Sequence, residues 1–352
     1  MSHPTPHFTL YQKASLSASL LLVLARTFKQ TAVLLWTSRF GVPFKRAIAI
    51  GYKRSAWKTL SYVQERYIMG TTGESIKKYC SSHRIAHSVV QLTGENPAAL
   101  HFVDTPEKPA GRILLYIHGG GHVYPIMAEG HIDVALQCAK AAKASLVLLE
   151  YALAPENPYP SQLVQAVDAL RWLLDSYKPD DLILGGDSAG GQTVLSLLVH
   201  LTKPSPYAPA ISLGDKRIRG ALASSPWVGF DYTAKSYQDN EKHDFLSRDA
   251  MLEITKLWNP KHEIWSDLLS VPKDTWQAAP VDRILLTVGT AEVFYDDVVE
   301  LGKVMGTVED PSGRVQIVKS KDDVHVGWIF NVALGLEPGP STKPVIEWLE
   351  KL

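Results

Sequence analysis

Short apolar runs alternate with longer amphipathic stretches along most of the chain after residue 75. The runs are bounded by Gly, Pro and Asp and predict buried strands at 113–117, 145–150, 182–185, 220–224, 283–288 and 315–318. The stretches between them predict helices, for instance over 132–143, 162–177 and 191–201. Nearly continuous apolar strands between helices are typical of a mostly parallel sheet with helices on both faces. A hairpin expected within 86–103 would add antiparallel strands at one edge.

Two regions depart from this rhythm. Residues 1–75 carry a helical pattern with few turn signals before Gly70-Thr71-Thr72-Gly73, and residues 227–275 form a long, polar, Trp-containing connection between two strands. Long connections in compact domains are usually lids or binding loops. The pattern therefore predicts a catalytic α/β domain over 76–226 and 276–352. A cap would be built from the insertion 227–275 together with the N-terminal helical segment 1–75.

The stretch 16–36 is rich in Leu, Val and Ala but is interrupted by Arg26 and Lys29. A charge at the centre of a membrane-spanning helix costs about 2.5–3.5 kcal/mol on insertion scales. We therefore expect an amphipathic helix packed on the body of the protein. An anchor lying in a membrane interface and a true membrane span are the alternatives, and the first of these would bring peripheral membrane contact through 16–36.

Charge and cysteine content narrow the class of protein. The 352 residues have a formal net charge of zero, with 45% hydrophobic and 20% charged residues, as in ordinary globular proteins. No long Lys/Arg run occurs, so we expect no nucleic-acid partner. The two cysteines, Cys80 and Cys138, do not make a disulfide framework, which favours a reducing, cytoplasmic location, with membrane association as the alternative. A homodimer is compatible with the sequence, which does not fix the oligomeric state.

The strongest chemical signal is Gly186-Asp187-Ser188-Ala189-Gly190, which follows a predicted strand directly and opens a predicted helix. A Gly-x-Ser-x-Gly pattern in that context is typical of a nucleophile elbow, in which a tight turn lifts the Ser188 hydroxyl above the sheet. Glycine at 186 and 190 relieves crowding in the turn. The Ala189 N–H would lie at a helix N-terminus, where unpaired donors favour negative charge.

A second signal is His118-Gly119-Gly120-Gly121, just after the strand at 113–117. No phosphate-loop pattern accompanies these glycines, and they make a helical His118/His122 metal pair improbable, so no metal site is expected. An oxyanion hole explains them better, because Gly120 and Gly121 can direct N–H groups at a developing negative charge, with Ala189 as a third donor. We expect His118 to hold this loop in place.

These blocks resemble the hormone-sensitive-lipase-like branch of the α/β hydrolases, which pairs a His-Gly-Gly-Gly motif with a Gly-Asp-Ser-Ala-Gly elbow. The block at 150–160, Glu-Tyr-Ala-Leu-Ala-Pro-Glu-Asn-Pro-Tyr-Pro, is similar to a third block of that family, and Ser225-Pro226-Trp227-Val228 matches a fourth. The resemblance covers roughly residues 60–350. It implies the α/β-hydrolase fold with a helical cap and a serine nucleophile, while the family's substrates range from acetyl esters to lipids and carbamates.

The fold's chain order of nucleophile, acid and then histidine selects the partners of Ser188. His325 follows the last predicted strand in a loop that resembles the family's His-Gly-Phe loop with one residue inserted, and it is the predicted base. The loop 289–297 should carry the acid, and its alignment to the family pattern favours Glu292, with Asp296 as the alternative. We expect Asp187 to brace the elbow and Glu156 to organise the loop behind the oxyanion hole.

The implied reaction is hydrolysis of a carboxylic ester through an acyl-enzyme, without metal or organic cofactor. We expect a small-molecule substrate that bears a small acyl group, such as acetyl, on a larger apolar molecule. Acyl transfer, lactonisation or condensation in secondary metabolism is the alternative on the same site. A catalytically inactive binding module and an esterase docked on lipid through 16–36 are further hypotheses. Aromatic residues of the insertion could line the substrate site or pack the core: Trp227, Tyr232, Tyr237, Trp258 and Trp265.

Overall fold

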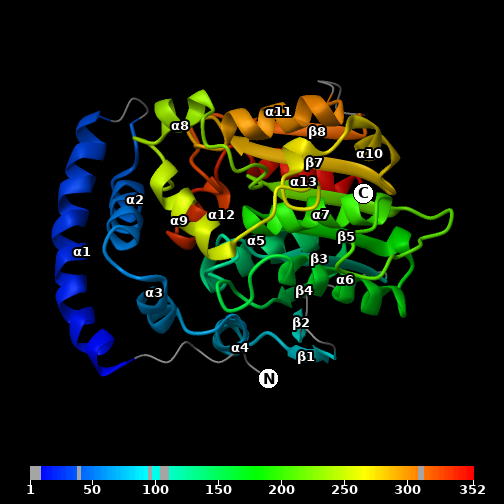
Figure 1. Ribbon diagram of the computed structural model, residues 1–352, viewed down its shortest axis with the longest axis horizontal. Helices are drawn as coiled ribbons and strands as arrows, with labels where there is room; N and C mark the ends of the chain where they lie inside the picture. The colour runs from blue at the N-terminus through cyan, green and yellow to red at the C-terminus, as the bar shows by residue number, and fades with distance from the viewer. Residues whose placement is uncertain (1–8, 38–40, 94–96, 104–110, 308–312) are drawn as a thin grey trace.

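A computed structural model describes residues 9–37, 41–93, 97–103, 111–307 and 313–352. Its centre is one eight-stranded sheet in the order β1-β2-β4-β3-β5-β6-β7-β8 (Figure 1). Strands β3 to β8 are parallel, whereas β1 pairs with β2 and β2 with β4 in antiparallel fashion. The expected edge hairpin and the six expected parallel strands are therefore present. The strands are β1 His87–Leu92, β2 Ala98–Val103, β3 Arg112–Ile117, β4 Ala144–Glu150, β5 Leu182–Asp187, β6 Ile218–Ser224, β7 Val281–Gly289 and β8 Val315–Ser320.

Helices cover both faces of the sheet, and further helices precede it in the chain. Two of the early helices begin at capping boxes, in which Ser61 and Thr71 each accept a hydrogen bond from the backbone N–H three residues on. The helices are α1 Leu10–Thr37, α2 Phe44–Trp57, α3 Tyr62–Met69, α4 Thr72–His83, α5 Ala128–Ala141, α6 Ser161–Leu174, α7 Ala189–Thr202, α8 Lys235–Asn240, α9 Arg248–Trp258, α10 Lys273–Ala278, α11 Tyr295–Met305, α12 Gly327–Ala333 and α13 Thr342–Glu350, with 3-10 turns at Pro179–Asp181 and Leu268–Ser270.

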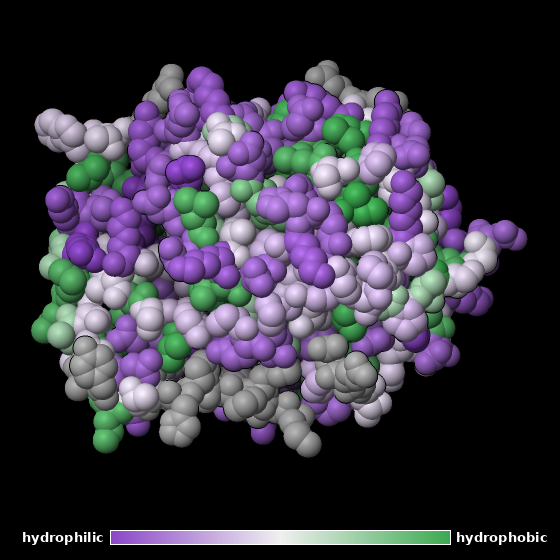
Figure 2. Space-filling model, in the orientation of Figure 1, coloured by the Kyte–Doolittle hydropathy of each residue, from purple (hydrophilic) through white to green (hydrophobic). Residues whose placement is uncertain are grey.

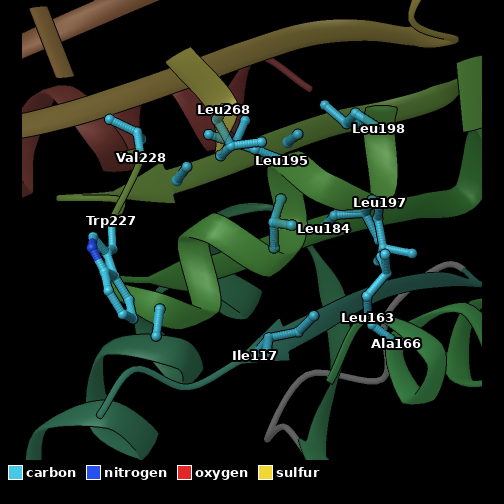
Figure 3. Packing of buried hydrophobic residues seen from close by; sticks show 14 of the residues in the cluster. Ile117, Leu163, Ala166, Leu184, Leu195, Leu197, Leu198, Trp227, Val228 and Leu268 are labelled. Atoms are coloured by element: carbon cyan, nitrogen blue, oxygen red, sulfur yellow. The ribbon is translucent and has the colours of Figure 1, made fainter. Parts of the chain in front are cut away.

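Alternation of side chains along the strands divides the core between the two faces of the sheet. In β3, Ile113, Leu115 and Ile117 pack on one face and Leu114 and Tyr116 on the other. Figure 3 shows part of the core on the first face, where Leu195 and Leu198 of α7 belong to the same cluster as the sheet residues Ile117 and Leu184. Because both faces are buried, the strands carry the near-continuous apolar runs seen in the sequence.

Helices α1 and α2 lie at one end of the molecule, whereas α4 packs on a face of the sheet through Ile76 and Tyr79. Figure 1 places α1 (blue) at the outer edge of the molecule, with α2 between α1 and the rest of the chain. Helix α4 crosses residue 75, so the helical N-terminal segment extends to His83. The insertion 227–275 forms α8, α9, a 3-10 turn and the first half of α10 between β6 and β7.

Candidate active site

Ser188 occupies the sharp turn between β5 and α7. Its backbone has φ 51° and ψ −120°, a conformation that is strained for a residue with a side chain and is typical of a nucleophile elbow. The neighbouring backbone leaves no room for side chains. A Cβ on Gly190 would lie 2.0 Å from the carbonyl oxygen of Ile117, and one on Gly186 would lie 2.7 Å from the carbonyl carbon of Gly190.

Three predicted residues come together at this turn. The Nε2 atom of His325 lies 2.9 Å from Ser188 Oγ, and its Nδ1 lies 3.3 Å from Glu292 Oε1. Glu292 follows β7 and is fully buried, and His325 follows β8 and is 3% exposed. Loops at the carboxyl ends of β5, β7 and β8 therefore supply a hydroxyl, a carboxylate and an imidazole in hydrogen-bonding order.

Asp296, the alternative acid, lies elsewhere. It is in the first turn of α11, and its Oδ2 accepts a hydrogen bond of 2.8 Å from the backbone N–H of Ser236 at the start of α8. The geometry therefore favours Glu292 over Asp296 as the partner of His325.

Two residues outside the predicted set hold Glu292 and the histidine loop. Ser225 donates from Oγ to Glu292 Oε2 at 2.7 Å and accepts from the backbone N–H of Val326 at 3.2 Å. Asp244, fully buried, accepts from the backbone N–H groups of His325 at 3.3 Å and Val293 at 2.9 Å. Ser225 belongs to a motif that the sequence analysis recognised. Nothing in the local sequence distinguishes Asp244 from the other acids of the insertion.

Burial raises the pKa of Asp244 to about 6, although His325 and two backbone N–H groups act in the opposite direction. This carboxyl also lies near Glu292, whose negative charge adds to the rise. Asp244 thus links the insertion to the base and to the loop of the acid.

The glycine-rich loop after β3 lines the same pocket as Ser188. Gly120 and Gly121 have φ of 107° and 63° and line a pocket together with Ser188. Ala189 begins α7, so its N–H is at the helix N-terminus. The three predicted oxyanion donors therefore belong to backbone segments adjacent to the serine.

Asp187 connects the elbow to this loop. Its Oδ1 accepts from the Tyr116 hydroxyl at 2.9 Å and from the Gly119 N–H at 3.2 Å, while its Oδ2 lies 3.2 Å from His131 Nε2. Burial alone would raise the pKa of Asp187, but His131 and these hydrogen bonds outweigh it and lower the pKa below its ordinary value. The sequence predicts the bracing role of Asp187, whereas no local signal identifies His131 as its partner.

His118 and Tyr151 also hold the glycine loop in place. His118 Nδ1 lies 2.6 Å from the Gly119 carbonyl oxygen, and Tyr151 donates to the His118 carbonyl at 2.8 Å. Burial, aided by the nearby His131, lowers the pKa of His118 to about 4, so its ring is neutral at physiological pH. This is the geometry of a residue that fixes the loop.

Glu156 forms an ion pair with the N-terminal segment of the chain. Its carboxylate pairs with Arg66 of α3 at 2.7 Å, and the same guanidinium donates from Nε to the Val123 carbonyl oxygen at 2.7 Å. Arg66 also donates to the carbonyl oxygen of Ala154. Helix α3 is thereby joined to the glycine loop and to the block at 150–160, a connection that sequence reasoning did not anticipate.

The space above Ser188, called here the catalytic pocket, is mostly apolar and is bounded by the glycine loop with the residues that follow it and by three further parts of the chain. The N-terminal helices contribute Lys53, Trp57, Glu65 and Met69; the insertion and its start contribute Trp227, Phe245, Leu246, Met251 and Ile254; and the last loop and helix contribute His325, Val326, Ile329 and Phe330. Of the five aromatic residues singled out in the sequence, only Trp227 is among the residues lining this pocket. Tyr232, Tyr237 and Trp258 are instead buried in the core.

A second cavity adjoins the catalytic pocket. It shares four lining residues with that pocket, Trp57, Tyr124, Phe245 and Ile254, and extends between α2 and α9 to Gln30 of α1. Both the N-terminal segment and the insertion 227–275 therefore contribute walls around the serine, which is the arrangement expected of a cap.

Comparison with known proteins identifies the architecture. A family model described as alpha/beta hydrolase fold matches residues 114–328. An esterase of Acinetobacter venetianus is 28% identical over 53% of this chain and 59% of its own length, and an acetyl-hydrolase of Streptomyces hygroscopicus is 28% identical over 54% and 61%. The chain thus spans about three fifths of the length of these relatives.

A solved structure described as an esterase from the bacterial hormone-sensitive lipase family superposes with a TM-score of 0.65 at 24% identity, covering 88% of this chain and 98% of that one. The predicted fold class and the predicted resemblance to the hormone-sensitive-lipase-like branch are confirmed.

Proposed function

Because the chain belongs to the α/β-hydrolase family, we propose that it is a carboxylic-ester hydrolase acting through an acyl-enzyme on Ser188. The observation that carries this proposal is the hydrogen-bonded series Ser188–His325–Glu292 at the base of an apolar pocket. A serine hydroxyl is a weak nucleophile until a neighbouring base removes its proton, and His325 Nε2 is within reach of that proton.

The proposed reaction follows from these positions. His325 takes the proton as Ser188 Oγ attacks the acyl carbon, and Glu292 holds the imidazole and stabilises its positive form. The N–H groups of Gly120, Gly121 and Ala189 stabilise the oxyanion; losing one such donor typically costs about 2.7–4 kcal/mol in the transition state. His325 then protonates the leaving alcohol, and water cleaves the acyl-enzyme.

The proposed substrate is a small-molecule ester with a small acyl group on a larger apolar alcohol. The apolar side chains of the pocket support an apolar substrate, and the similarity to an esterase and to an acetyl-hydrolase supports a short acyl group. Acyl transfer, lactonisation and condensation in secondary metabolism gain no support from these relatives, so hydrolysis is the reaction proposed.

Hydrolysis of p-nitrophenyl acetate, butyrate and octanoate by the wild type and by Ser188→Ala tests the proposal. We expect the wild type to prefer the acetate or butyrate and Ser188→Ala to be inactive on all three esters. Equal activity of both proteins would reject Ser188 as the nucleophile. No activity of the wild type on any of the three esters would argue against ester hydrolysis.

We further propose that α1 and α2 dock the enzyme on an anionic lipid surface. Most apolar side chains of α1 are turned away from the protein: Leu21 is 70% exposed, Phe28 78% and Trp36 92%. Figure 2 shows hydrophobic (green) side chains along the left edge of the molecule, where Figure 1 places α1. The segment Ser15–Thr37 is long and apolar enough to cross a membrane, judged by length and composition alone.

Charge and packing favour docking over spanning. Every Asp and Glu of the chain lies at or beyond Glu65, so Lys and Arg supply all the charged side chains of α1 and α2. Lys29 and Lys45 are exposed, whereas Lys53 lines the catalytic pocket; each exposed basic residue near an anionic surface contributes about 1 kcal/mol to binding. Arg26, in the middle of α1, donates to the Lys58 carbonyl oxygen at 3.1 Å and to Thr59 Oγ1 at 2.8 Å, which ties α1 to the end of α2. Together with the buried free thiols of Cys80 and Cys138, this supports a cytoplasmic enzyme at a membrane surface.

Co-sedimentation with vesicles tests this docking. We expect the full chain to bind vesicles containing phosphatidylserine, more weakly at high salt, and to bind pure phosphatidylcholine poorly. The triple variant Leu21→Gln/Phe28→Gln/Trp36→Gln should stay in the supernatant and hydrolyse p-nitrophenyl acetate normally. Equal sedimentation of both proteins would contradict the proposal. So would a wild-type homodimer that the triple variant does not form, because a second copy would then cover this face.

A further inference from the structure

Glu65 of α3 is a buried carboxylate in the catalytic pocket that the proposed reaction does not use. It is 6% exposed and lines the same pocket as Ser188 and His325. Its Oε1 is buried without a hydrogen-bond partner among the described residues. A buried polar atom left unpaired costs about 1–3 kcal/mol, so the fold alone gives no reason for a carboxylate at this position.

Other polar groups surround this carboxylate. The indole Nε1 of Trp57 is likewise buried and unpartnered within the described residues, and Lys53 of α2 lines the same pocket. Burial raises the pKa of Glu65 to about 7, while Lys53 and the Trp57 N–H act against the rise. Burial likewise lowers the pKa of Lys53, with Glu65 opposing it. The three groups therefore interact inside the pocket, and two of them have unused hydrogen-bonding capacity.

Most of the other side chains that line the pocket are apolar, unlike this cluster. Side chains such as Met69, Leu246, Met251 and Phe330 offer no strong hydrogen-bonding group to a ligand. A substrate that fills the pocket therefore meets apolar side chains except near Ser188 and its neighbours, at Tyr124 and at the cluster around Glu65. Small-molecule sites commonly combine apolar walls with a few placed polar groups that set specificity.

We propose that Glu65, Trp57 and Lys53 form a polar subsite that binds a free hydroxyl group of the substrate. The preferred ester is then a monoester of a diol or polyol with an apolar skeleton. A hydroxyl donates to the Glu65 carboxylate and accepts from the Trp57 N–H or the Lys53 ammonium. An amine would meet the positive charge of Lys53, and a carboxylate would meet the negative charge of Glu65. The inference rests on the proposed ester hydrolysis and adds the chemical class of the substrate.

Matched substrate pairs test the subsite. The monoacetates of the α,ω-diols of butane, octane and dodecane are compared with the butyl, octyl and dodecyl acetates, and the ratio of kcat/KM within each pair is measured. The proteins are the wild type, Glu65→Leu, Glu65→Gln, Lys53→Met and the control Lys45→Met, which changes an exposed lysine of the same helix outside the pocket.

The wild type should favour the hydroxylated ester at least tenfold in the pair whose length fits. Glu65→Leu should remove or reverse this preference, so that the ratio of kcat/KM within the pair falls to about one or below. Glu65→Gln, whose amide oxygen still accepts a hydrogen bond, should keep part of it. Lys53→Met should weaken the preference, and Lys45→Met should leave it unchanged.

Two results would overturn the subsite: a wild type that does not distinguish the esters of any pair, or a Glu65→Leu variant that loses activity on both esters with an unchanged ratio. If Glu65→Leu does not fold, the isosteric Glu65→Gln and Lys53→Met decide, and unchanged ratios in both overturn the inference. Hydrolysis of p-nitrophenyl acetate by a wild type inactive on every pair would reject the subsite alone. Inactivity on all esters would reject the proposed function as well.

Discussion

At the scale of single residues, two side chains that do not line the catalytic pocket hold the acid and the histidine loop in place. Ser225 and Asp244 fix Glu292 and the backbone of the His325 loop by hydrogen bonds to the acid and to three N–H groups. An imidazole acts as a base only in the correct orientation and tautomer, which its carboxylate partner selects. We therefore regard Glu292 as a positioning and electrostatic partner, supported by Ser225 from one side.

Substitution of the two candidate acids should separate their roles. Glu292→Gln keeps the size of the side chain but removes the charge that stabilises the imidazolium, so kcat should fall on the order of a thousandfold to ten-thousandfold. Asp296→Asn should keep kcat within about threefold of the wild type and lower Tm, because Asp296 holds the start of α8. Steady-state kinetics on p-nitrophenyl acetate and thermal melts measure both effects. A large loss of kcat in Asp296→Asn with little loss in Glu292→Gln would identify Asp296 as the acid.

At the scale of elements, the sheet could be predicted because each parallel strand is buried on both faces and so carries a continuous apolar run. The elbow and the glycine loop could be predicted because tight backbone turns require glycine at fixed positions, and those glycines are visible in the local sequence. The contacts of Arg66 and Asp244 could not, since they join segments far apart in the chain whose approach depends on tertiary packing. The sequence predicts that α1 packs on the body, with an anchor in a membrane interface as the alternative. The structure packs α1 on α2 through a narrow stripe that includes Val23 and Leu34 and leaves its other side exposed.

Helix α9 should set the length of the acyl group or alcohol that the enzyme accepts. Ile254 lines both the catalytic pocket and the second cavity, and a Cβ on Gly121 would lie 2.6 Å from its Cγ2. Ile254→Ala should therefore widen the passage between the two spaces and raise the octanoate-to-acetate ratio of kcat/KM roughly fivefold or more. Leu252→Ala, on the exposed side of the same helix, is the control. An unchanged ratio in Ile254→Ala would show that α9 does not limit chain length.

At the scale of the whole molecule, Glu65 makes stability depend on pH with a sign opposite to that of ordinary acid denaturation. Its pKa is about 7 in the folded protein and 4.5 in its ordinary state. Between these values the folded chain retains a proton that the unfolded chain has lost, so stability falls as pH rises from about 4.5 to about 7. The same burial that would make Glu65 a recognition group for a hydroxyl thus weakens the fold at neutral pH.

Glu65→Gln should accordingly stabilise the protein at pH 8 and have little effect at pH 4.5. The gain should reach at most about 3 kcal/mol, because one pKa unit corresponds to about 1.4 kcal/mol. Urea unfolding at several pH values between these limits measures the free energy of unfolding of each protein. A Glu74→Gln variant, altering an acid outside the pocket, should not show this pH-dependent gain. Parallel stability curves for the wild type and Glu65→Gln would contradict the account.

The most direct measurement for the whole account is the mapping of a fluorophosphonate adduct by peptide mass spectrometry. The hydrogen bond between Ser188 and His325 predicts one adduct, on Ser188, which forms much more slowly in His325→Ala and is absent from Ser188→Ala. An adduct on another residue, or a wild type that remains unlabelled, would contradict the central claim that Ser188 is an activated nucleophile.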